Sequence, residues 1–208
     1  MNQRLRLTLM TVATVVLLGV LAFVLLWNPD SQPATGAVKS GSFAGALRPT
    51  TPPASFRLKD EEGKTVDVAR YRGSPVVVTF LYTGCQNDCP TIAQQVRGAL
   101  DELGTDVPVV AVSVDPAGDT PASARRFLAR QRLSGRMRFL LGTESDLQPV
   151  WRSFGIAPQA EGREHSASVV LLGPDGRQAI GFPISELTPE GLASDLRLLG
   201  AGQDAPKS

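Results

Sequence analysis

Two cysteines and one histidine are the strongest candidates for chemistry in this chain, and it contains no others of either kind. Three residues separate Cys85 from Cys89, so the two are close enough to share a metal ion or to form a disulfide. Together with His165 they would make a soft, three-coordinate ligand set, which suits Cu(I) and also holds Cu(II). A closed structural zinc site would ask for a fourth protein ligand. The donor set therefore favours copper.

Both parts of this set have an ordinary alternative. Two cysteines outside the cytoplasm often form an inert disulfide. A bridge between Cys85 and Cys89 would close a very short loop, and the loop-entropy argument gives it little stabilising effect. A lone histidine is usually a surface or core residue. His165 therefore joins a site only if the fold brings it to the cysteines.

The segment FLYTGCQNDCP, residues 80–90, runs from the end of an apolar strand into the start of a helix. Binding sites in open α/β sheets form at such strand ends. We expect Pro90 to be the first helical residue and Cys89 to be the N-cap. The positive end of the helix would then favour the Cys89 thiolate.

Apolar periodicity predicts the elements that position these residues. The runs at 75–82 and 107–114 are typical of strands buried on both faces, and Thr-Pro pairs open two of the helices. In order, we expect a hairpin over 55–68, strand 75–82, helix 91–103, strand 107–114, helix 121–133, strand 137–141, helix 145–154, a hairpin over 166–182 and a helix from 189 to about 200.

This order predicts an α/β fold with a central mixed sheet flanked by helices and an N-terminal β-hairpin extension. A closing antiparallel hairpin followed by a helix is the layout of the thioredoxin superfamily. In that layout, the loop that ends at His165 faces the start of the first helix, where the cysteines are. Residues distant in sequence would then lie close in space.

The N-terminus predicts a single membrane-spanning helix. Residues 7–27 carry no charge and are long enough to cross a hydrocarbon core of ~30 Å. Arg4 and Arg6 precede them, so the N-terminus should stay cytoplasmic and the rest should lie outside. The alternative is a cleaved signal peptide, but the apolar run is long for one and no clear cleavage site closes it.

We therefore expect four regions: a membrane anchor at 1–27, a flexible Pro/Gly/Ser linker at 28–53, a thioredoxin-like copper-binding domain at 54–200 and a disordered tail at 201–208. A formal net charge of +1 gives no reason to expect nucleic acid as a partner.

Three motifs, TFLYTGCQNDCP, SVDPAGDTP and HSASVVLLGPDGR, resemble in this order the Sco/SenC family of copper chaperones. The likeness covers about residues 50–200 and the anchor. It implies that Cys85, Cys89 and His165 bind one copper ion for delivery to the dinuclear copper site of cytochrome c oxidase. The implied partners are that oxidase's copper-bearing subunit, a copper donor and a thiol reductant.

The alternative function is an extracytoplasmic thiol–disulfide oxidoreductase that reduces the cysteines of the oxidase site through Cys85 and Cys89. Only in that role would the chain be an enzyme. The role needs both thiols but does not need His165 as a ligand. The two functions therefore separate at the histidine.

Four further residues are candidates for the surroundings of the site. Asp115 and Asp119, in SVDPAGDTP, match family acids near the site, although each could simply end a strand or start a helix. Tyr82 could line the pocket or belong to the core. Gln86 stands where family members often carry Pro, and we expect at most altered loop rigidity from this change.

A peroxidase of the related peroxiredoxin fold would show the pattern P-x-x-x-[TS]-x-x-C. Counting back from Cys85, the proline and hydroxyl positions hold Val78 and Tyr82. Counting back from Cys89, they hold Tyr82 and Gln86. Neither cysteine fits the pattern.

An arginine-rich stretch with no acidic residue spans 125–138. Such a run is usually a solvated helix face. The alternative is a docking surface for an acidic partner or for lipid headgroups. Its members are Arg125, Arg126, Arg130, Arg132, Arg136 and Arg138.

Overall fold

The computed structural model describes residues 43–157 and 168–201. Their framework is a six-stranded mixed sheet in the order β1-β8-β7-β4-β5-β6. Strands β4, β5 and β6 are parallel, whereas β7 runs antiparallel to β4 and to β8. The strands are β1 (Ala46–Leu47), β4 (Val76–Leu81), β5 (Val109–Ser113), β6 (Arg138–Leu140), β7 (Ser168–Leu172) and β8 (Gln178–Pro183).

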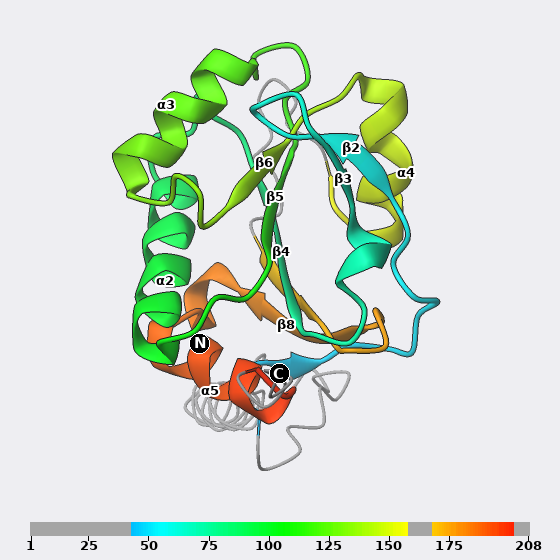
Figure 1. Ribbon diagram of the computed structural model, residues 1–208, viewed down its shortest axis with the longest axis vertical. Helices are drawn as coiled ribbons and strands as arrows, with labels where there is room; N and C mark the ends of the chain where they lie inside the picture. The colour runs from blue at the N-terminus through cyan, green and yellow to red at the C-terminus, as the bar shows by residue number, and fades with distance from the viewer. Residues whose placement is uncertain (1–42, 158–167, 202–208) are drawn as a thin grey trace, which may run out of the picture. The chain divides into compact units, whose positions relative to one another are not determined.

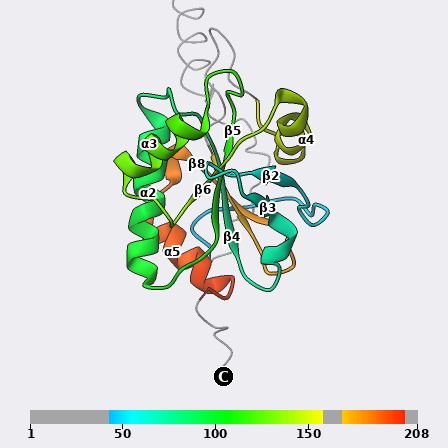
Figure 2. The same ribbon diagram turned by 45° about the horizontal axis from the view of Figure 1, so that its top comes forward.

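Helices cover both faces of this sheet. The first face carries α2 (Asp88–Leu103), α3 (Pro121–Gln131) and α5 (Pro189–Leu198). The second carries α4 (Glu144–Phe154) and the hairpin of β2 (Arg57–Lys59) and β3 (Thr65–Asp67), as Figures 1 and 2 show. Side chains of β4 alternate between the two cores, as a buried strand requires. Short 3₁₀ turns lie at Val68–Tyr71 and Ile184–Glu186.

The predicted α/β class, the mixed sheet flanked by helices and the N-terminal hairpin extension are confirmed. The hairpin turns at residues 60–63, where Asp60 accepts hydrogen bonds from the N–H groups of Glu62 (3.0 Å) and Lys64 (2.8 Å). Gly63 has a φ of +80°, a conformation that side chains with a Cβ rarely adopt.

The end of the predicted linker differs from expectation, because residues 43–53 are joined to the domain. Strand β1 pairs with β8, and the N–H groups of Ala44 (2.7 Å) and Gly45 (2.9 Å) donate to the buried carboxylate of Asp195. A Cβ on Gly45 would lie only 2.4 Å from a methyl group of Ile180. The small residues that resemble a linker in composition are here what lets the backbone pack closely.

Several predictions concern residues outside the described ranges. These are the anchor at 1–27, the linker up to residue 42, the ligand His165 and the tail from residue 202. In the two described ranges, no helix is both long and apolar enough to cross a membrane.

Candidate metal site

The cysteines lie where the chain passes from β4 to α2. After Leu81 the chain leaves the sheet, and the Cys85 N–H donates to the Tyr82 carbonyl (3.3 Å). The Gln86 side-chain amide donates to the Gly84 carbonyl (3.1 Å). Gln86 therefore restrains the loop with a hydrogen bond, at the position where the resemblance would place a proline ring.

Helix α2 begins earlier than predicted. Its N-cap is Asn87, so Cys89 is the second helical residue and Pro90 the third. The prediction of Cys89 as N-cap and Pro90 as first residue was wrong. Proline is tolerated throughout the first turn, because the amides there have no intrahelical acceptor in any case. Asn87 makes no side-chain capping hydrogen bond.

The sulfur of Cys85 takes the place of that missing cap. The Cys89 N–H donates to Cys85 Sγ at 3.1 Å, so the positive end of α2 acts on the Cys85 sulfur. Neither Cys85 nor Cys89 forms a disulfide in this structure. Cys85 is 9% exposed and Cys89 is fully buried.

The expectation that the Cys89 thiolate is favoured was also wrong. Burial, reinforced by the hydrogen bond with Cys85, raises the pKa of the Cys89 thiol. The two thiols therefore have different environments. Cys85 is buried but retains slight exposure and receives the helix amide, whereas Cys89 is fully buried in the same core cluster.

Tyr82 both belongs to the core and borders the two thiols, which are the two roles considered for it. Its partly buried ring contacts the hydrophobic clusters on both faces of the sheet. Burial, followed by the neighbouring Cys85, raises the pKa of its phenol. Tyr82 is thus a core residue that also borders the thiols.

Asp119 fixes the loop that carries Cys85. Its buried carboxylate accepts hydrogen bonds from the Thr83 N–H (2.7 Å) and the Ser113 hydroxyl (2.6 Å). Burial raises the pKa of Asp119, while these two hydrogen bonds act in the opposite direction. We call the segment between β4 and α2, residues 82–87, the thiol loop. The Asp119 carboxylate connects the end of β5 to this loop through two charge-assisted hydrogen bonds.

Asp115 behaves as its alternative assignment predicted and closes a turn. Its carboxylate accepts from the Gly118 N–H (3.0 Å), and its carbonyl accepts from the Asp119 N–H (2.9 Å). A Cβ on Gly118 would lie 2.3 Å from the Asp115 carboxylate. From the sequence, Asp115 and Asp119 were equal candidates for the site. In the structure only Asp119 bonds to the loop that carries Cys85.

Sequence reasoning missed two residues that support Asp119. Ser113 donates to it, and the indole N–H of Trp151 donates to the Ser113 carbonyl (2.9 Å). A serine at the end of an apolar strand was a usable signal for Ser113. Trp151 comes from α4 on the far side of the sheet, and nothing in its local sequence indicates this contact.

The third predicted ligand, His165, lies outside the described residues, but the strand that follows it is described. Strand β7 begins at Ser168, whose carbonyl accepts from the Thr79 hydroxyl (3.2 Å). Strand β7 is antiparallel to β4, and Val169 pairs with Thr79. The first residue of β7 therefore lies beside the C-terminal end of β4, where the chain leaves the sheet for the loop that carries Cys85. Within the ranges that the structure describes, no group of three or more His, Cys, Asp or Glu could hold a metal ion.

Comparison with known proteins identifies similar sequences. The SCO1/SenC family model matches residues 46–199. The SCO1 protein homolog of Bacillus subtilis is 29% identical over 153 residues, covering 68% of this chain and 79% of that protein. The chloroplastic peroxiredoxin Q of Populus jackii is 34% identical over 104 residues, but covers only 50% of this chain and 46% of that protein.

Solved structures share the fold as well. The copper-bound ScoI of Bradyrhizobium japonicum is 28% identical, with a TM-score of 0.57 over 72% of this chain and 99% of that one. BsSco, described as a member of the Sco family of cytochrome c oxidase assembly proteins and as having a disulfide switch, is 25% identical, with a TM-score of 0.60 over 73% of this chain and 98% of that one.

Proposed function

The chain belongs to the SCO1/SenC family, and on this premise we propose that it is a copper chaperone for cytochrome c oxidase. Its thioredoxin-like domain binds one copper ion as cargo through Cys85, Cys89 and His165. It delivers this ion to the dinuclear copper site of the oxidase. The copper-bound ScoI structure and the description of BsSco as an oxidase assembly protein support this assignment.

The observation that carries the proposal is the pairing of the two thiols. The contact between the Cys89 N–H and Cys85 Sγ holds the less buried thiol beside the first turn of α2, next to the fully buried one. Thiolates are preferred ligands for Cu(I). Because copper displaces protons from both thiols, affinity should rise with pH, and the raised pKa of Cys89 strengthens this dependence.

The placement of β7 supports His165 as the third ligand. His165 is three residues before Ser168, a distance that an extended chain spans in at most about 10 Å. Ser168 in turn lies beside the C-terminal end of β4, from which the thiol loop departs. This short separation supports the proposal that His165 is the third ligand.

The remaining parts of the function follow from the sequence. The apolar segment at 7–27 would anchor the chain in the cell membrane by a single pass, with the N-terminus cytoplasmic and the domain extracytoplasmic. A Cys85–Cys89 disulfide cannot supply thiolates, so loading requires a thiol reductant as well as a copper donor. Ligand exchange between thiolates then passes the ion to the copper-bearing subunit of the oxidase.

The test is an anaerobic Cu(I) titration of the reduced full-length chain, in a neutral detergent, against a competing chelator. We expect one tightly bound copper per chain. His165→Ala should weaken binding by at least about tenfold, a loss that even outer-shell partners of metal ligands produce. The matched control is Ser166→Ala. Absence of competitive binding by the wild-type chain, with both thiols free, would contradict the chaperone assignment.

The unequal thiols favour a second candidate, a thiol–disulfide oxidoreductase. Cys85, the less buried of the two thiols, would attack a target disulfide, and the fully buried Cys89 would resolve the mixed disulfide, leaving the target reduced and this chain oxidised. His165→Ala should spare this activity, measured as thiols released from an oxidised copper-bearing domain of the oxidase. Equal loss of copper binding and reduction, with the fold intact, would show that the two functions do not separate at His165.

A further inference from the structure

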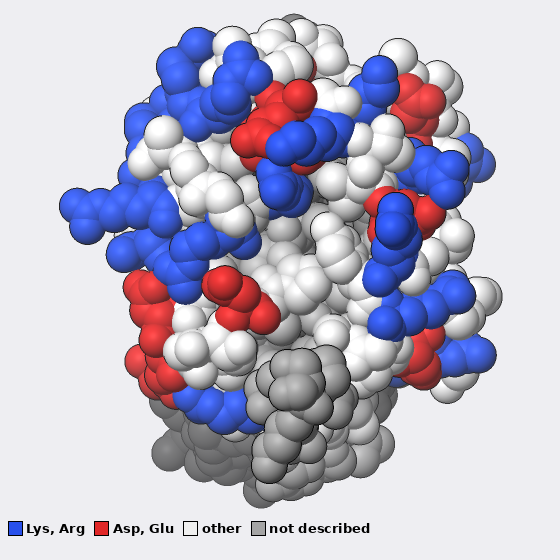
Figure 3. Space-filling view, in the orientation of Figure 1, with Lys and Arg blue, Asp and Glu red and all other residues white. Residues whose placement is uncertain are grey.

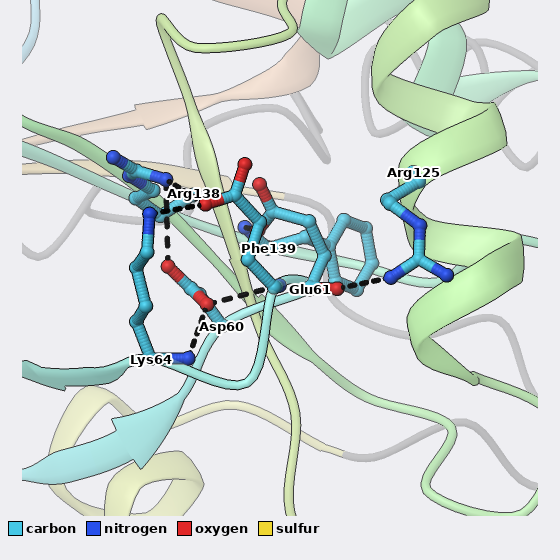
Figure 4. A network of polar contacts seen from close by, with 7 residues as sticks. Asp60, Glu61, Lys64, Arg125, Arg138 and Phe139 are labelled. Atoms are coloured by element: carbon cyan, nitrogen blue, oxygen red, sulfur yellow. Dashed lines mark hydrogen bonds and ion pairs between the residues drawn. The ribbon is translucent and has the colours of Figure 1, made fainter.

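The turn of the β2–β3 hairpin, residues 60–63, contacts two of the six arginines between residues 125 and 138; we call this turn the hairpin tip. Arg125 donates to the Glu61 carbonyl at 2.6 Å, and Arg138 lies 3.5 Å from the carboxylates of Asp60 and Glu62. Figure 4 shows both arginines converging on the tip from opposite sides. The Glu61 carboxylate also accepts from the N–H of Phe139 in β6 (2.8 Å). These two arginines brace the hairpin against the sheet edge.

A third arginine is also paired. Arg136 contacts the Asp101 carboxylate of α2 at 2.5 Å, and Arg97 lies 3.8 Å from the same carboxylate. Arg136 therefore joins two elements of the fold. It is not available to a partner without loss of that contact.

The other three, Arg126, Arg130 and Arg132, form a separate set that we call the α3 patch. All three are exposed, and no described carboxylate forms an ion pair with any of them. Arg126 and Arg130 are one helical turn apart on α3, and Arg132 is the residue that ends it. Figure 3 shows Lys and Arg side chains gathered over the region of α3. The patch stands out because the whole chain carries a net charge of only +1.

The α3 patch lies beside the thiol-bearing helix. Gln131 at the end of α3 contacts Gln94 of α2 across 3.5 Å. At its other end, α3 begins two residues after Asp119, whose carboxylate holds Thr83 of the thiol loop. A partner seated on this patch would therefore also lie beside α2, the helix whose first turn carries Cys89.

Resting on the proposed function, we infer that the α3 patch docks an acidic surface of the protein that receives copper from Cys85 and Cys89. Protein is favoured over lipid because the exposed large apolar side chains of the described residues, Leu47 and Leu198, are not on α3. A lipid-binding helix normally inserts such side chains below the headgroups.

Charges at the edge of a contact act mainly on the rate of encounter. They steer association over long distances and raise its rate by about 10- to 1000-fold at low salt. At physiological ionic strength the Debye length shortens to about 8 Å, so most of this attraction is screened. The α3 patch should therefore accelerate docking strongly at low salt and weakly at high salt.

The experiment compares two triple charge reversals in the full-length chain, in a neutral detergent. One is Arg126→Glu, Arg130→Glu and Arg132→Glu. The matched control is Arg70→Glu, Arg72→Glu and Arg152→Glu, which removes the same charge from exposed positions on the hairpin and α4 side of the sheet. Association with the soluble copper-bearing domain of the oxidase is followed by stopped-flow fluorescence, with and without copper, at about 20 mM and about 500 mM salt.

We expect the patch reversal to slow association by at least about tenfold at low salt and to differ little from wild type at high salt. The control should stay within about twofold of wild type. Equal rates for the two reversals, or no association of the wild type, overturn the docking inference. Copper affinity is titrated separately, so failure of the copper-binding function is distinguishable.

A second measurement tests lipid as the occupant. Sedimentation with vesicles rich in phosphatidylglycerol reports whether the α3 patch contacts an anionic bilayer. Co-sedimentation that the patch reversal abolishes and the control reversal preserves would assign the patch to lipid and overturn the inference. Equal sedimentation of both variants supports a protein occupant.

Discussion

The start of helix α2 differs from the starts of α3 and α4. Helix α3 is closed by Thr120 and Ser123, each of which accepts from the N–H of the other (3.1 and 2.9 Å). Helix α4 is closed in the same way by Thr143 and Asp146. At α2, by contrast, the N-cap side chain makes no hydrogen bond, and the Cys85 sulfur receives a first-turn N–H instead.

The difference shows how this fold separates stability from chemistry. The ends of α3 and α4 are satisfied by residues three positions apart, so they need nothing from the rest of the molecule. The approach to α2 is held by Asp119, which is distant in sequence, and by a sulfur that must change partner when it binds metal or forms a disulfide. The uncapped end is the one that carries the reactive groups.

The strongest way to test this comparison is the reactivity of the two thiols. We expect iodoacetamide at pH 8 to modify Cys85 about 100-fold faster than Cys89, because Cys89 is fully buried and burial raises its pKa. Peptide mass spectrometry over time measures both rates in the reduced chain. The control is the chain in denaturant, where the rates should converge. Equal rates for the two thiols, or faster modification of Cys89, would refute the assignment of unequal thiols.

Removal of Asp119 should have the next largest effect. Asp119→Ala leaves the Ser113 hydroxyl and the Thr83 N–H without their acceptor, and should lower the free energy of unfolding by about 2 kcal/mol or more. Urea denaturation measures the loss. Asp115→Ala, which removes a turn hydrogen bond at a more exposed site, is the matched control and should cost less. Equal losses would mean that Asp119 does not hold the thiol loop.

The pH dependence of stability sharpens the same point. Burial raises the pKa of Asp119 above its ordinary value of ~4, so the native state holds this proton more tightly than the unfolded state. The stability that this shift adds to the folded state is fully present below the ordinary pKa of an aspartate. It is lost as pH rises through the raised pKa of Asp119. Asp119→Asn should remove this decline, as urea denaturation between about pH 3.5 and pH 7 will show. Parallel curves for the two proteins would contradict the predicted shift.

The smallest effect should come from the capped helices. Thr120→Ala and Thr143→Ala should each lower the free energy of unfolding by about 1 kcal/mol, the usual cost of losing an N-cap. Copper affinity should not change, because neither residue contacts the thiol loop. Urea denaturation and the Cu(I) titration measure the two quantities. Weakened copper binding in either variant would show that the capped starts of α3 and α4 also contribute to the copper site.

The periodic features of the chain were predictable from sequence. The apolar runs gave β4 and β5, and the Thr-Pro pairs located the starts of α3 and α5. These signals are local, because a buried strand or a capped helix start depends on residues a few positions apart. The same local reasoning placed the start of α2 incorrectly, since a proline fits anywhere in a first helical turn.

The contacts of individual side chains were not predictable in the same way. Residues 43–53 have the composition of a linker, yet backbone hydrogen bonds to Asp195 and β8 join their N-terminal part to the domain. Backbone pairing of this kind leaves little trace in side-chain type. Asp115 and Asp119 were equivalent candidates until the burial of Asp119 and its bond to Thr83 distinguished them.

The sequence alone determined the family motifs, the α/β class and the two thiols at the end of an apolar strand. Only the tertiary structure decided that Cys85 is the less buried thiol and receives the helix amide, that Cys89 is fully buried, and that Asp119 fixes their loop. The physical reason is that burial and hydrogen bonding depend on which segments meet. The thiol loop meets residues from β5 and, through Ser113, from α4, and no local pattern records those encounters.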